Sequence, residues 1–455
     1  MSAPVLSIII LAAMFLLATV LPLNMGALAF VGAFLLGSVV LGMSTNEILA
    51  NFPGGLFLTI VGVTYLFAIA QNNGTIDLLV RGAVKLVGSR VALIPWVMFA
   101  ITAVITAVGA LSPAAVAIIA PIALSFAGKY KISPLLMGMM VIHGAQAGGF
   151  SPIAVYGVTV NGILAKTDLA FSPTALFLSS LVFNLVIALV LFVVLGGRNL
   201  LSSRVGQFVE QAAEARMAVS VGAKAGADVP FKGFGSGMYG PRDPAGDGVA
   251  ATKERRERIP QLVTIAGLIV LAVVALGFKM DVGFVSITIA IVLALVSPTA
   301  QKGAINKISW STVLLICGML TFVGVLEEAG TIEFVSGGVA GMGMPLLAAL
   351  IICFIGAVVS AFASSTAILA ALIPLAVPFL STGEIGAVGV ICALAVSATI
   401  VDVSPFSTNG ALVLANAPEG VDKDRFYKQI LGYSGIVIVV GPVLAWLALV
   451  VPGWL

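Results

Sequence analysis

A short polar run interrupts one of the last apolar stretches of the chain. The sequence VDVSPFSTNGALVLA, residues 401–415, crowds an acid, a proline, two serines, a threonine and an asparagine into eight positions. Proline lacks an amide hydrogen and breaks a helix, so backbone groups near Pro405 need other partners. The neighbouring hydroxyl and amide side chains could supply those partners, which is the simpler interpretation, or they could bind a solute. Irregular backbone of this kind occurs at membrane depth only where it is buried in protein or lines a cavity.

Three similar interruptions occur elsewhere in long apolar stretches. They are GALSPAA at 109–115, GGFSPIA at 148–154 and FASSTAI at 362–368, and none contains a charge. Hydroxyl groups, backbone amides and the amino ends of helices bind anions. The residues predicted to bind an anionic substrate are Ser112, Pro113, Ser151, Ser364, Ser365, Thr366, Ser407, Thr408 and Asn409.

The same interruptions also offer oxygen atoms to a cation. Side-chain oxygens and the carbonyl ends of broken helices suit a hard ion such as sodium. The predicted sodium ligands are Ser112, Gly148, Gly149, Ser365, Asp402 and Ser404. Asp402 is the one acid deep in an apolar run, and such a carboxylate is a functional candidate by default. It could line a cation site, carry a proton, or serve as a structural hydrogen-bond acceptor. His143, the single histidine, is predicted to be a packing residue rather than a proton relay.

Composition identifies the class of protein that holds these residues. Of 455 residues, 60% are hydrophobic and 9% are charged, and mean hydropathy is +1.19, so we expect an integral membrane protein. The net charge of +3 includes no block of like charge that would indicate nucleic acid. Three cysteines lie in apolar runs and are predicted to pack rather than to form disulfides. No nucleotide loop, metal-ligand cluster or activated nucleophile is visible, so we expect neither an enzyme nor a bound cofactor.

Apolar runs long enough to cross a membrane predict an all-α fold. About ten transmembrane helices and two re-entrant hairpins are predicted from the runs at 5–23, 26–43, 54–72, 91–127, 133–163, 173–197, 260–278, 282–298, 309–326, 344–380, 385–417 and 429–452. The segments 91–127 and 344–380 are predicted to be hairpins whose tips stop inside the membrane. Two full helices joined by a tight turn are the alternative. The segments 133–163 and 385–417 are predicted to be discontinuous helices.

Basic residues predict the orientation of these spans. With the polar linker at 198–259 in the cytoplasm, only Lys166 and Lys279 of the 22 lysines and arginines lie outside, which leaves twenty inside. This positive-inside bias places both termini in the periplasm of a bacterial inner membrane.

The two halves of the chain match each other. Adding 253 carries Ser112 onto Ser365 and the Ser-Pro pair at 151 onto the pair at 404, while adding 256 carries GTID at 74 onto GTIE at 330. Each half has an odd number of crossings, so residues 1–197 and 260–455 are predicted to be inverted repeats. Inverted repeats with paired broken helices are typical of secondary transporters.

The residues quoted above carry a resemblance to a known family. LPLNMGALAFVGAFLLG at 21–37, GALSPAA and GGFSPIAVYG resemble the amino-terminal domain of the bacterial malonate and dicarboxylate carriers called MatC. The whole chain is more distantly similar to the divalent-anion sodium symporters of the ion transporter superfamily. The resemblance implies a homodimer with a scaffold domain and a moving, elevator-type transport domain. That superfamily carries Ser-Asn-Thr at its hairpin tips; here the asparagine is absent from both, so only the serines carry over.

We therefore expect a secondary transporter that imports a small dicarboxylate, malonate by resemblance, with sodium. A proton-coupled carrier and a sodium/proton antiporter of the same fold are the alternatives. The antiporter would call for more titratable residues in its core than Asp402 and His143 provide. A passive channel fits poorly with two opposed hairpins.

Overall fold

The structure is a computed structural model, and it describes residues 2–86, 90–201, 247–278, 280–340, 344–362, 364–418 and 420–454. Over these ranges the regular elements are helices, with no β-strand, which confirms an all-α polytopic membrane protein. Six of the described helices are long and apolar enough to cross a membrane. These are α1 (Ala3–Val20), α4 (Gly54–Asn72), α7 (Ser112–Lys129), α10 (Pro173–Val194), α16 (Trp310–Glu328) and α22 (Lys423–Leu449).

Shorter helices complete both halves of the chain. In the first half they are α2 (Met25–Phe34), which continues as the π-helical segment η1 (Leu35–Val40), α3 (Thr45–Ala50), α5 (Thr75–Leu86), α6 (Leu93–Ala107), α8 (Pro134–Gly149), α9 (Val155–Leu164) and α11 (Gly197–Leu200). In the second half they are α14 (Val282–Val296), α15 (Pro298–Gln301), η2 (Ala304–Lys307), α17 (Thr331–Ala340), α18 (Pro345–Ser360), α19 (Ser365–Ser381), α20 (Ala387–Ile400) and α21 (Thr408–Ala415). The long helix α13 (Asp247–Gly277) precedes them.

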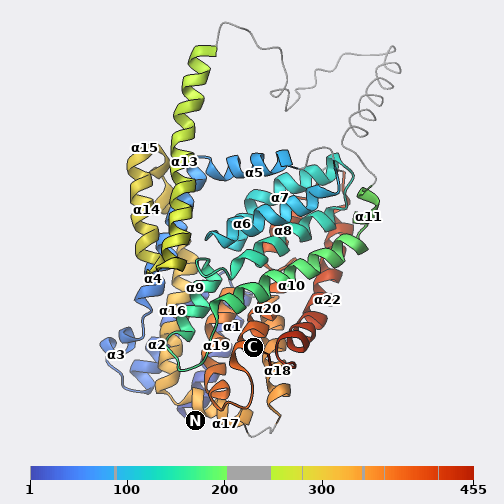
Figure 1. The fold of residues 1–455 in the computed structure, drawn as a ribbon. Coiled ribbons are helices and arrows are strands. Elements are labelled where there is room, and N and C mark those ends of the chain that lie inside the picture. Colours follow the sequence, from blue (N-terminus) through green and yellow to red (C-terminus); the bar gives the residue numbers. More distant parts are fainter. Residues whose placement is uncertain are drawn as a thin grey trace.

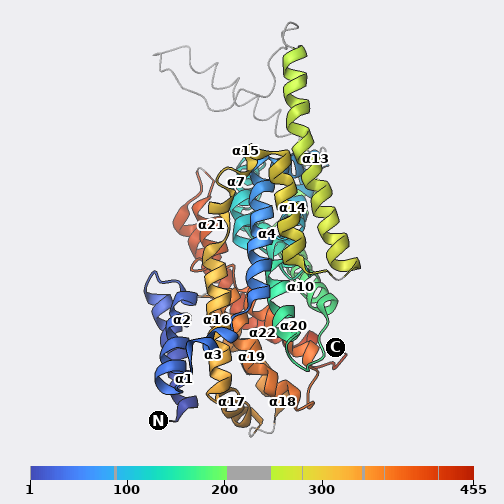
Figure 2. The ribbon, with the colours of Figure 1, turned by 90° about the vertical axis from the view of Figure 1, so that its left-hand side faces the viewer.

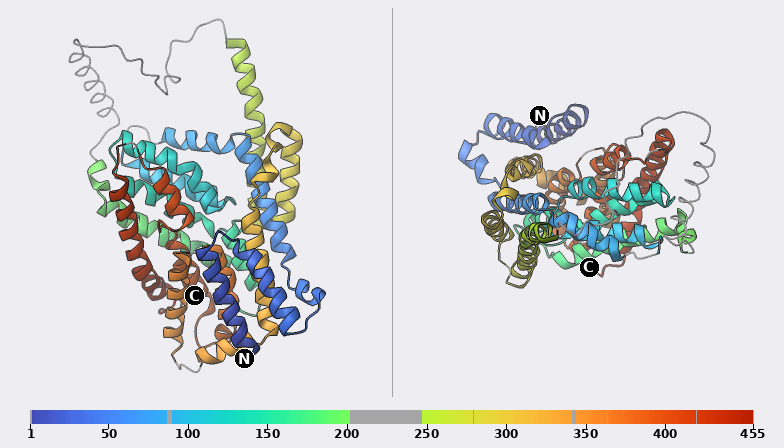
Figure 3. Two further views of the ribbon diagram at one scale, coloured as in Figure 1. Left: turned by 180° about the vertical axis from the view of Figure 1, so that it is seen from behind. Right: turned by 90° about the horizontal axis from the view of Figure 1, so that it is seen from above.

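The helices gather into two groups (Figure 1). Seen from above, α1–α4 and α13–α16 lie on one side, and α6–α10 and α18–α22 on the other (Figure 3). We call the first group the peripheral bundle and the second the hairpin bundle. The hairpin bundle encloses the largest apolar core, while two smaller cores lie mainly within the peripheral bundle. In the peripheral bundle, α4 packs on α14 and α2 packs on α16 (Figure 2). The 256-residue offset relates these two pairs to each other.

Equivalent helices of the two halves run in opposite directions. Helix α4 leads to α5 at the end of the molecule where α13 begins, and α16 leads to α17 at the opposite end, near the N-terminus (Figure 1). Each of these junctions is a glycine with positive φ, 76° at Gly74 and 69° at Gly330. Glycine adopts this conformation at no steric cost, so both turns are possible only with this residue type or at a strain.

The predicted hairpins and broken helices meet in the middle of the molecule. Helices α6 and α7 form one pair, joined at residues 108–111, and α18 and α19 form the other, joined at 361–364. The two pairs occupy opposite ends of the hairpin bundle, and the bends of both pairs turn toward its centre (Figure 1). Helices α8 and α9 are separated by residues 150–154, and α20 and α21 by 401–407. We call these two segments, each with the helix turns that flank it, break 1 and break 2, and the two bends, each with its flanking helix turns, tip 1 and tip 2.

Both breaks are held together by the same close packing of a glycine against a backbone carbonyl. In each, a glycine in the first turn of the second helix lies against a carbonyl of the break: Gly157 against Ser151 and Gly410 against Ser404. The offset of 253 relates these pairs. A Cβ atom at either glycine would overlap that carbonyl oxygen.

Replacing either glycine is therefore expected to unfold the break that it closes. Gly157→Ala and Gly410→Ala should each destabilise the protein by about 1–3 kcal/mol or more, because the backbone must shift to relieve the overlap. The yield of monodisperse protein and its melting temperature in detergent measure the effect. Gly432→Ala is the matched control, because a Cβ atom in that exposed part of α22 meets nothing within 4 Å. Unchanged melting of the two break variants would contradict the closure described here.

Some bounds differ from the sequence-based prediction. The predicted linker runs to residue 259, whereas α13 already begins at Asp247 because its charged first turns continue the helical register of the apolar span. The part of the linker at 202–246 lies outside the described residues. The sequence does not predict helices α5 and α17, since each is short and carries an acidic residue in its first turn.

Candidate substrate and cation site

Asn409 joins break 2 to tip 1. Its Nδ2 donates hydrogen bonds to the hydroxyl of Ser112, at 2.8 Å, and to a carboxylate oxygen of Asp402, also at 2.8 Å. Both amide hydrogens are thus used. The residue is fully buried, yet its Oδ1 has no hydrogen-bond partner among the described residues. Since a buried carbonyl oxygen without a partner is costly, it marks a place where a donor or a cation would bind.

The two serines of break 2 stabilise the break itself. The Ser407 hydroxyl lies 2.7 Å from the carbonyl oxygens of Asp402 and Ser404, and its oxygen accepts the Gly410 amide that caps α21. The Ser404 hydroxyl accepts the amide of Phe406 at 3.2 Å. Thr408 is exposed. Of the four polar residues predicted from Ser404 to Asn409, only Asn409 reaches the other half of the chain.

Tyr156 joins break 1 to tip 2 in the corresponding way. Its phenol lies beside the side chains of Thr366 and Ser365, and within electrostatic range of Asp402. The hydroxyl of Ser365 also accepts a hydrogen bond from Ser360 at 2.9 Å. All four of these tip and break side chains, Tyr156, Ser360, Ser365 and Thr366, are less than a tenth exposed.

The repeat relates the two contacts. An offset of 253 carries Ser112 onto Ser365 and Tyr156 onto Asn409, so each tip contacts the break of the other half. The sequence prediction missed Tyr156, because a tyrosine in an apolar helix is usually a packing residue. The offset would have found it, since it places Tyr156 opposite Asn409, which was predicted.

The two contacts differ in chemistry. The position equivalent to Asp402 is Gly149, where an added Cβ atom would lie 3.0 Å from the ring of Tyr156. Ring and glycine thus fill the space that carboxylate and amide fill in the second half. Gly148 packs against Ala103 and Thr106 of α6, and its carbonyl accepts the amide of Ser151 at 3.1 Å. The carboxylate of this central site therefore comes from break 2.

Three helix amino ends near the site have no side-chain cap. They belong to α7, α9 and α19, whose N-cap residues are Leu111, Ala154 and Ser364. Such ends carry partial positive charge and free amides, which favour an anion. Ser112 and Ser365, the first residues of α7 and α19, are buried; Pro113 is half-buried and Ser364 is exposed. Ser151 in break 1 is buried as well, at 7% exposure.

His143 belongs to a separate network. Its Nδ1 lies 2.8 Å from Asn184 Oδ1 and its Nε2 lies 2.6 Å from the Tyr433 hydroxyl. Asn184 in turn donates to the Ser180 carbonyl at 2.9 Å, so its oxygen faces the imidazole as an acceptor. The histidine thus links α8 to α10 and α22, as expected of a packing residue.

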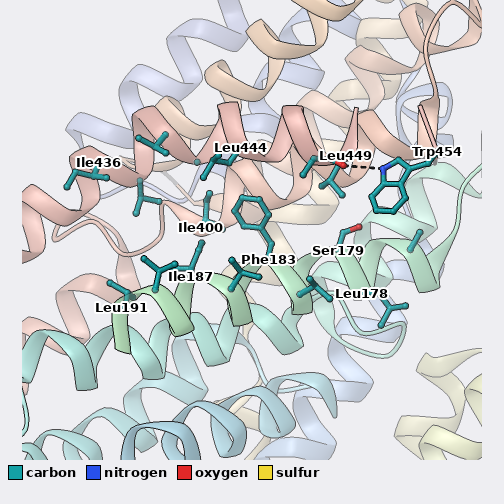
Figure 4. A pocket seen from close by; sticks show the side chains of 18 of the residues that line it. Leu178, Ser179, Phe183, Ile187, Leu191, Ile400, Ile436, Leu444, Leu449 and Trp454 are labelled. Atoms are coloured by element: carbon teal, nitrogen blue, oxygen red, sulfur yellow. Dashed lines mark hydrogen bonds between the residues drawn. The ribbon is translucent and has the colours of Figure 1, made fainter. Parts of the chain in front are cut away.

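A separate groove runs between α10 and α22 but is unsuited to a dicarboxylate. Its volume is about 890 Å³, and apolar side chains such as Leu178, Ile187 and Leu444 line it (Figure 4). Among its lining residues there is no charged side chain. The candidate site is therefore the one formed by the tips and breaks.

Removing the phenol hydroxyl of Tyr156 should weaken this site without changing its shape. Losing a hydrogen bond to a charged ligand costs roughly 1.5–3 kcal/mol. We therefore expect Tyr156→Phe to lower apparent substrate affinity about tenfold or more, measured as KM for uptake, with protein yield unchanged. Tyr65→Phe, in the peripheral bundle, is the control. An unchanged KM in Tyr156→Phe would remove this hydroxyl from the site.

Comparisons with known proteins find relatives of the N-terminal region and of the fold. Residues 1–149 match the family described as the dicarboxylate carrier protein MatC N-terminus. Among 21 matching chains of solved structures is the YdaH transporter of Alcanivorax borkumensis, described as having an unusual topology. It is 14% identical, with a TM-score of 0.53, and the match covers 88% of this chain and 86% of that one. A search of curated protein sequences finds no match. Residues 1–149 therefore resemble the N-terminal region of a dicarboxylate carrier, and the chain shares its fold with a solved transporter.

Proposed function

From this MatC-type N-terminal region and transporter fold, we propose that the chain imports a small dicarboxylate by secondary active transport coupled to sodium. Malonate is the proposed substrate because the resemblance is to carriers of that class. The observation that carries the proposal is the crossed contact between halves, in which Asn409 of break 2 meets Ser112 of tip 1 and Tyr156 of break 1 lies beside Ser365 of tip 2. A solute bound there would touch all four segments.

The surroundings suit a carboxylate group. No lysine or arginine lies in the segments 91–127, 133–163, 344–380 and 385–417, which contain the tips and breaks. The uncapped amino ends of α7, α9 and α19 and the hydroxyls of Ser112, Tyr156 and Ser365 remain as the groups that can hold negative charge. Because these groups only partly compensate a dianion, an accompanying cation is needed to offset the cost of burying it.

The cation is proposed to bind at break 2. There the Asp402 carboxylate, the free Oδ1 of Asn409 and the Ser112 hydroxyl lie within one hydrogen-bonded cluster, and all are oxygen ligands. Sodium prefers such ligands, as other hard cations do. The equivalent cluster of the first half has Gly149 and Tyr156 instead, so we propose one principal cation site rather than one in each half.

Alternating access is proposed to exchange two packing arrangements. Ala367 and Ala370 of α19 are fully buried in the core that α16 shares. Their equivalents on α7, Ala114 and Ala117, are exposed. In a transporter built from inverted repeats, the state open to the other side of the membrane would bury the alanines of α7 and expose those of α19. We propose that residues 1–197 and 260–455 form such repeats and that the hairpin bundle moves as an elevator against the peripheral bundle, with bends at Gly74 and Gly330.

The chain is a multi-pass membrane protein, and we propose which of its ends faces each side of the membrane. We place it in the bacterial inner membrane as a homodimer, with both termini in the periplasm and the end that carries α5 and α15 in the cytoplasm. Lys302, exposed at that end, provides the test. A cysteine introduced there should be protected from an impermeant thiol reagent in intact cells, and strong labelling would reverse the orientation.

Uptake of radiolabelled malonate into proteoliposomes tests the function. Sodium and proton gradients are imposed separately at fixed external pH. We expect a sodium gradient to drive uptake and replacement of sodium by potassium to abolish it. Uptake driven equally by a proton gradient in sodium-free buffer would favour the proton-coupled carrier. No malonate uptake under any gradient would overturn the proposed substrate.

A further inference from the structure

A second polar cavity lies beside break 1, away from the crossed contacts. Its volume is about 640 Å³. It is lined by the amino end of α4, the carboxyl end of α9 and the turn between α13 and α14. We call it the side pocket. It lies between the two bundles, because α4 and α14 belong to the peripheral bundle and α9 to the hairpin bundle.

Two charged side chains line the side pocket, and they are held differently. The carboxylate of Asp281 accepts the amide of Phe284 at 3.0 Å and caps α14, so part of its charge is offset by that helix end. Lys166 is exposed, and its ammonium group forms no ion pair or hydrogen bond with another described residue. Asn161 lines the same wall, and its side-chain amide is likewise unbonded within the described part of the chain. Lys166 is therefore the charged group of the pocket whose side chain has no partner among the described residues.

The side pocket adjoins the candidate site but is separated from it. Pro152, which lines the pocket, directly follows Ser151 of break 1. The side chain of Val63 and the backbone oxygen of Ile153, both buried residues, lie close to Gly109 at tip 1. An anion in the pocket would thus lie next to break 1 but outside the candidate site.

We infer that the side pocket is an outer capture site for the anionic substrate, with Lys166 as its attracting charge. The inference rests on the proposed function, since it names the route by which a dicarboxylate would reach break 1. Lys166 is one of two basic residues on the side of the membrane opposite the linker by the charge pattern. Such a charge raises the local concentration of an anion and therefore its rate of arrival, and salt screens the effect.

Opposite charge changes in the pocket should move KM in opposite directions. At low ionic strength we expect Lys166→Ala to raise the KM for malonate about threefold and Lys166→Glu to raise it about tenfold. Asp281→Asn should lower KM, because asparagine retains the helix cap and removes the negative charge. The maximal rate should be unchanged in all three variants. At high ionic strength the ratio of each variant's KM to the wild-type KM should approach one.

Intact cells, which present a single face of the protein, provide the assay. Lys302→Ala removes the same charge from an exposed position at the other end of the molecule and should leave KM unchanged. Wild-type uptake with the same KM in Lys166→Ala, Lys166→Glu and Asp281→Asn would overturn the capture site alone. A salt-independent change, or the same shift in Lys302→Ala, would also overturn it. Absence of malonate uptake by the wild type would overturn the proposed function, and this inference with it.

Discussion

Asp402→Asn is expected to lower sodium-driven malonate uptake about a hundredfold or more. Asparagine has the same shape and can still accept the hydrogen bond from Asn409, so the break should fold as before. What is lost is the one carboxylate among the proposed cation ligands. Removing one partner of a buried pair of charges costs roughly 3–5 kcal/mol, which corresponds to a factor of at least about one hundred. Initial rates of uptake at the sodium concentration that half-saturates the wild type measure the loss.

A control separates this effect from a general change of charge. Asp424→Asn alters an exposed carboxylate in the first turn of α22 and should leave uptake unchanged. Raising the sodium concentration should partly restore an Asp402→Glu variant, which keeps the charge, but not Asp402→Asn. Wild-type rates and wild-type sodium dependence in Asp402→Asn would mean that the coupling ion binds elsewhere.

Asn409→Ala and Ser112→Ala should each reduce substrate affinity by about tenfold to a hundredfold, because each removes one side of the contact between break 2 and tip 1. The two residues share one hydrogen bond, so the double variant should lose much less than the product of the single losses. Titration of malonate against the four proteins in sodium buffer gives the cycle.

Thr288→Ala serves as the control for loss of a helical hydroxyl. Its side chain is exposed and bonds the carbonyl of Phe284 in its own helix at 2.8 Å. Affinities that multiply independently in the double variant would show that Asn409 and Ser112 do not act through their contact. Wild-type affinity in both single variants would place the substrate elsewhere in the protein.

The sequence predicts the position of the site better than the role of each residue in it. Proline next to serine in an apolar run, found at both 152 and 405, is enough to locate the two breaks, and hydroxyls without charge locate the two tips. The contact between Asn409 and Ser112 joins residues that were both candidates. Helix bounds at the tips and breaks follow from the same local signals.

The roles of the residues depend on distances between segments, which no local sequence pattern contains. Ser407 was a candidate ligand, but its hydroxyl is used to cap α21 and hold break 2. Tyr156 was not a candidate, although it occupies the place of Asn409 in the other half. The difference between Gly149 and Asp402 is visible in the sequence, yet only the packing of the Tyr156 ring against Gly149 gives it a meaning.

Malonate binding to the purified protein, measured by calorimetry in sodium and in potassium buffer, tests the central claim most directly. The claim is that substrate and cation share the site formed by Asp402, Asn409 and Ser112. We predict that malonate binds the wild type at least about tenfold more weakly in potassium buffer than in sodium buffer. For Asp402→Asn we predict the same affinity in both buffers. Equal affinity in both buffers, unchanged in Asp402→Asn and Asn409→Ala, would contradict the claim.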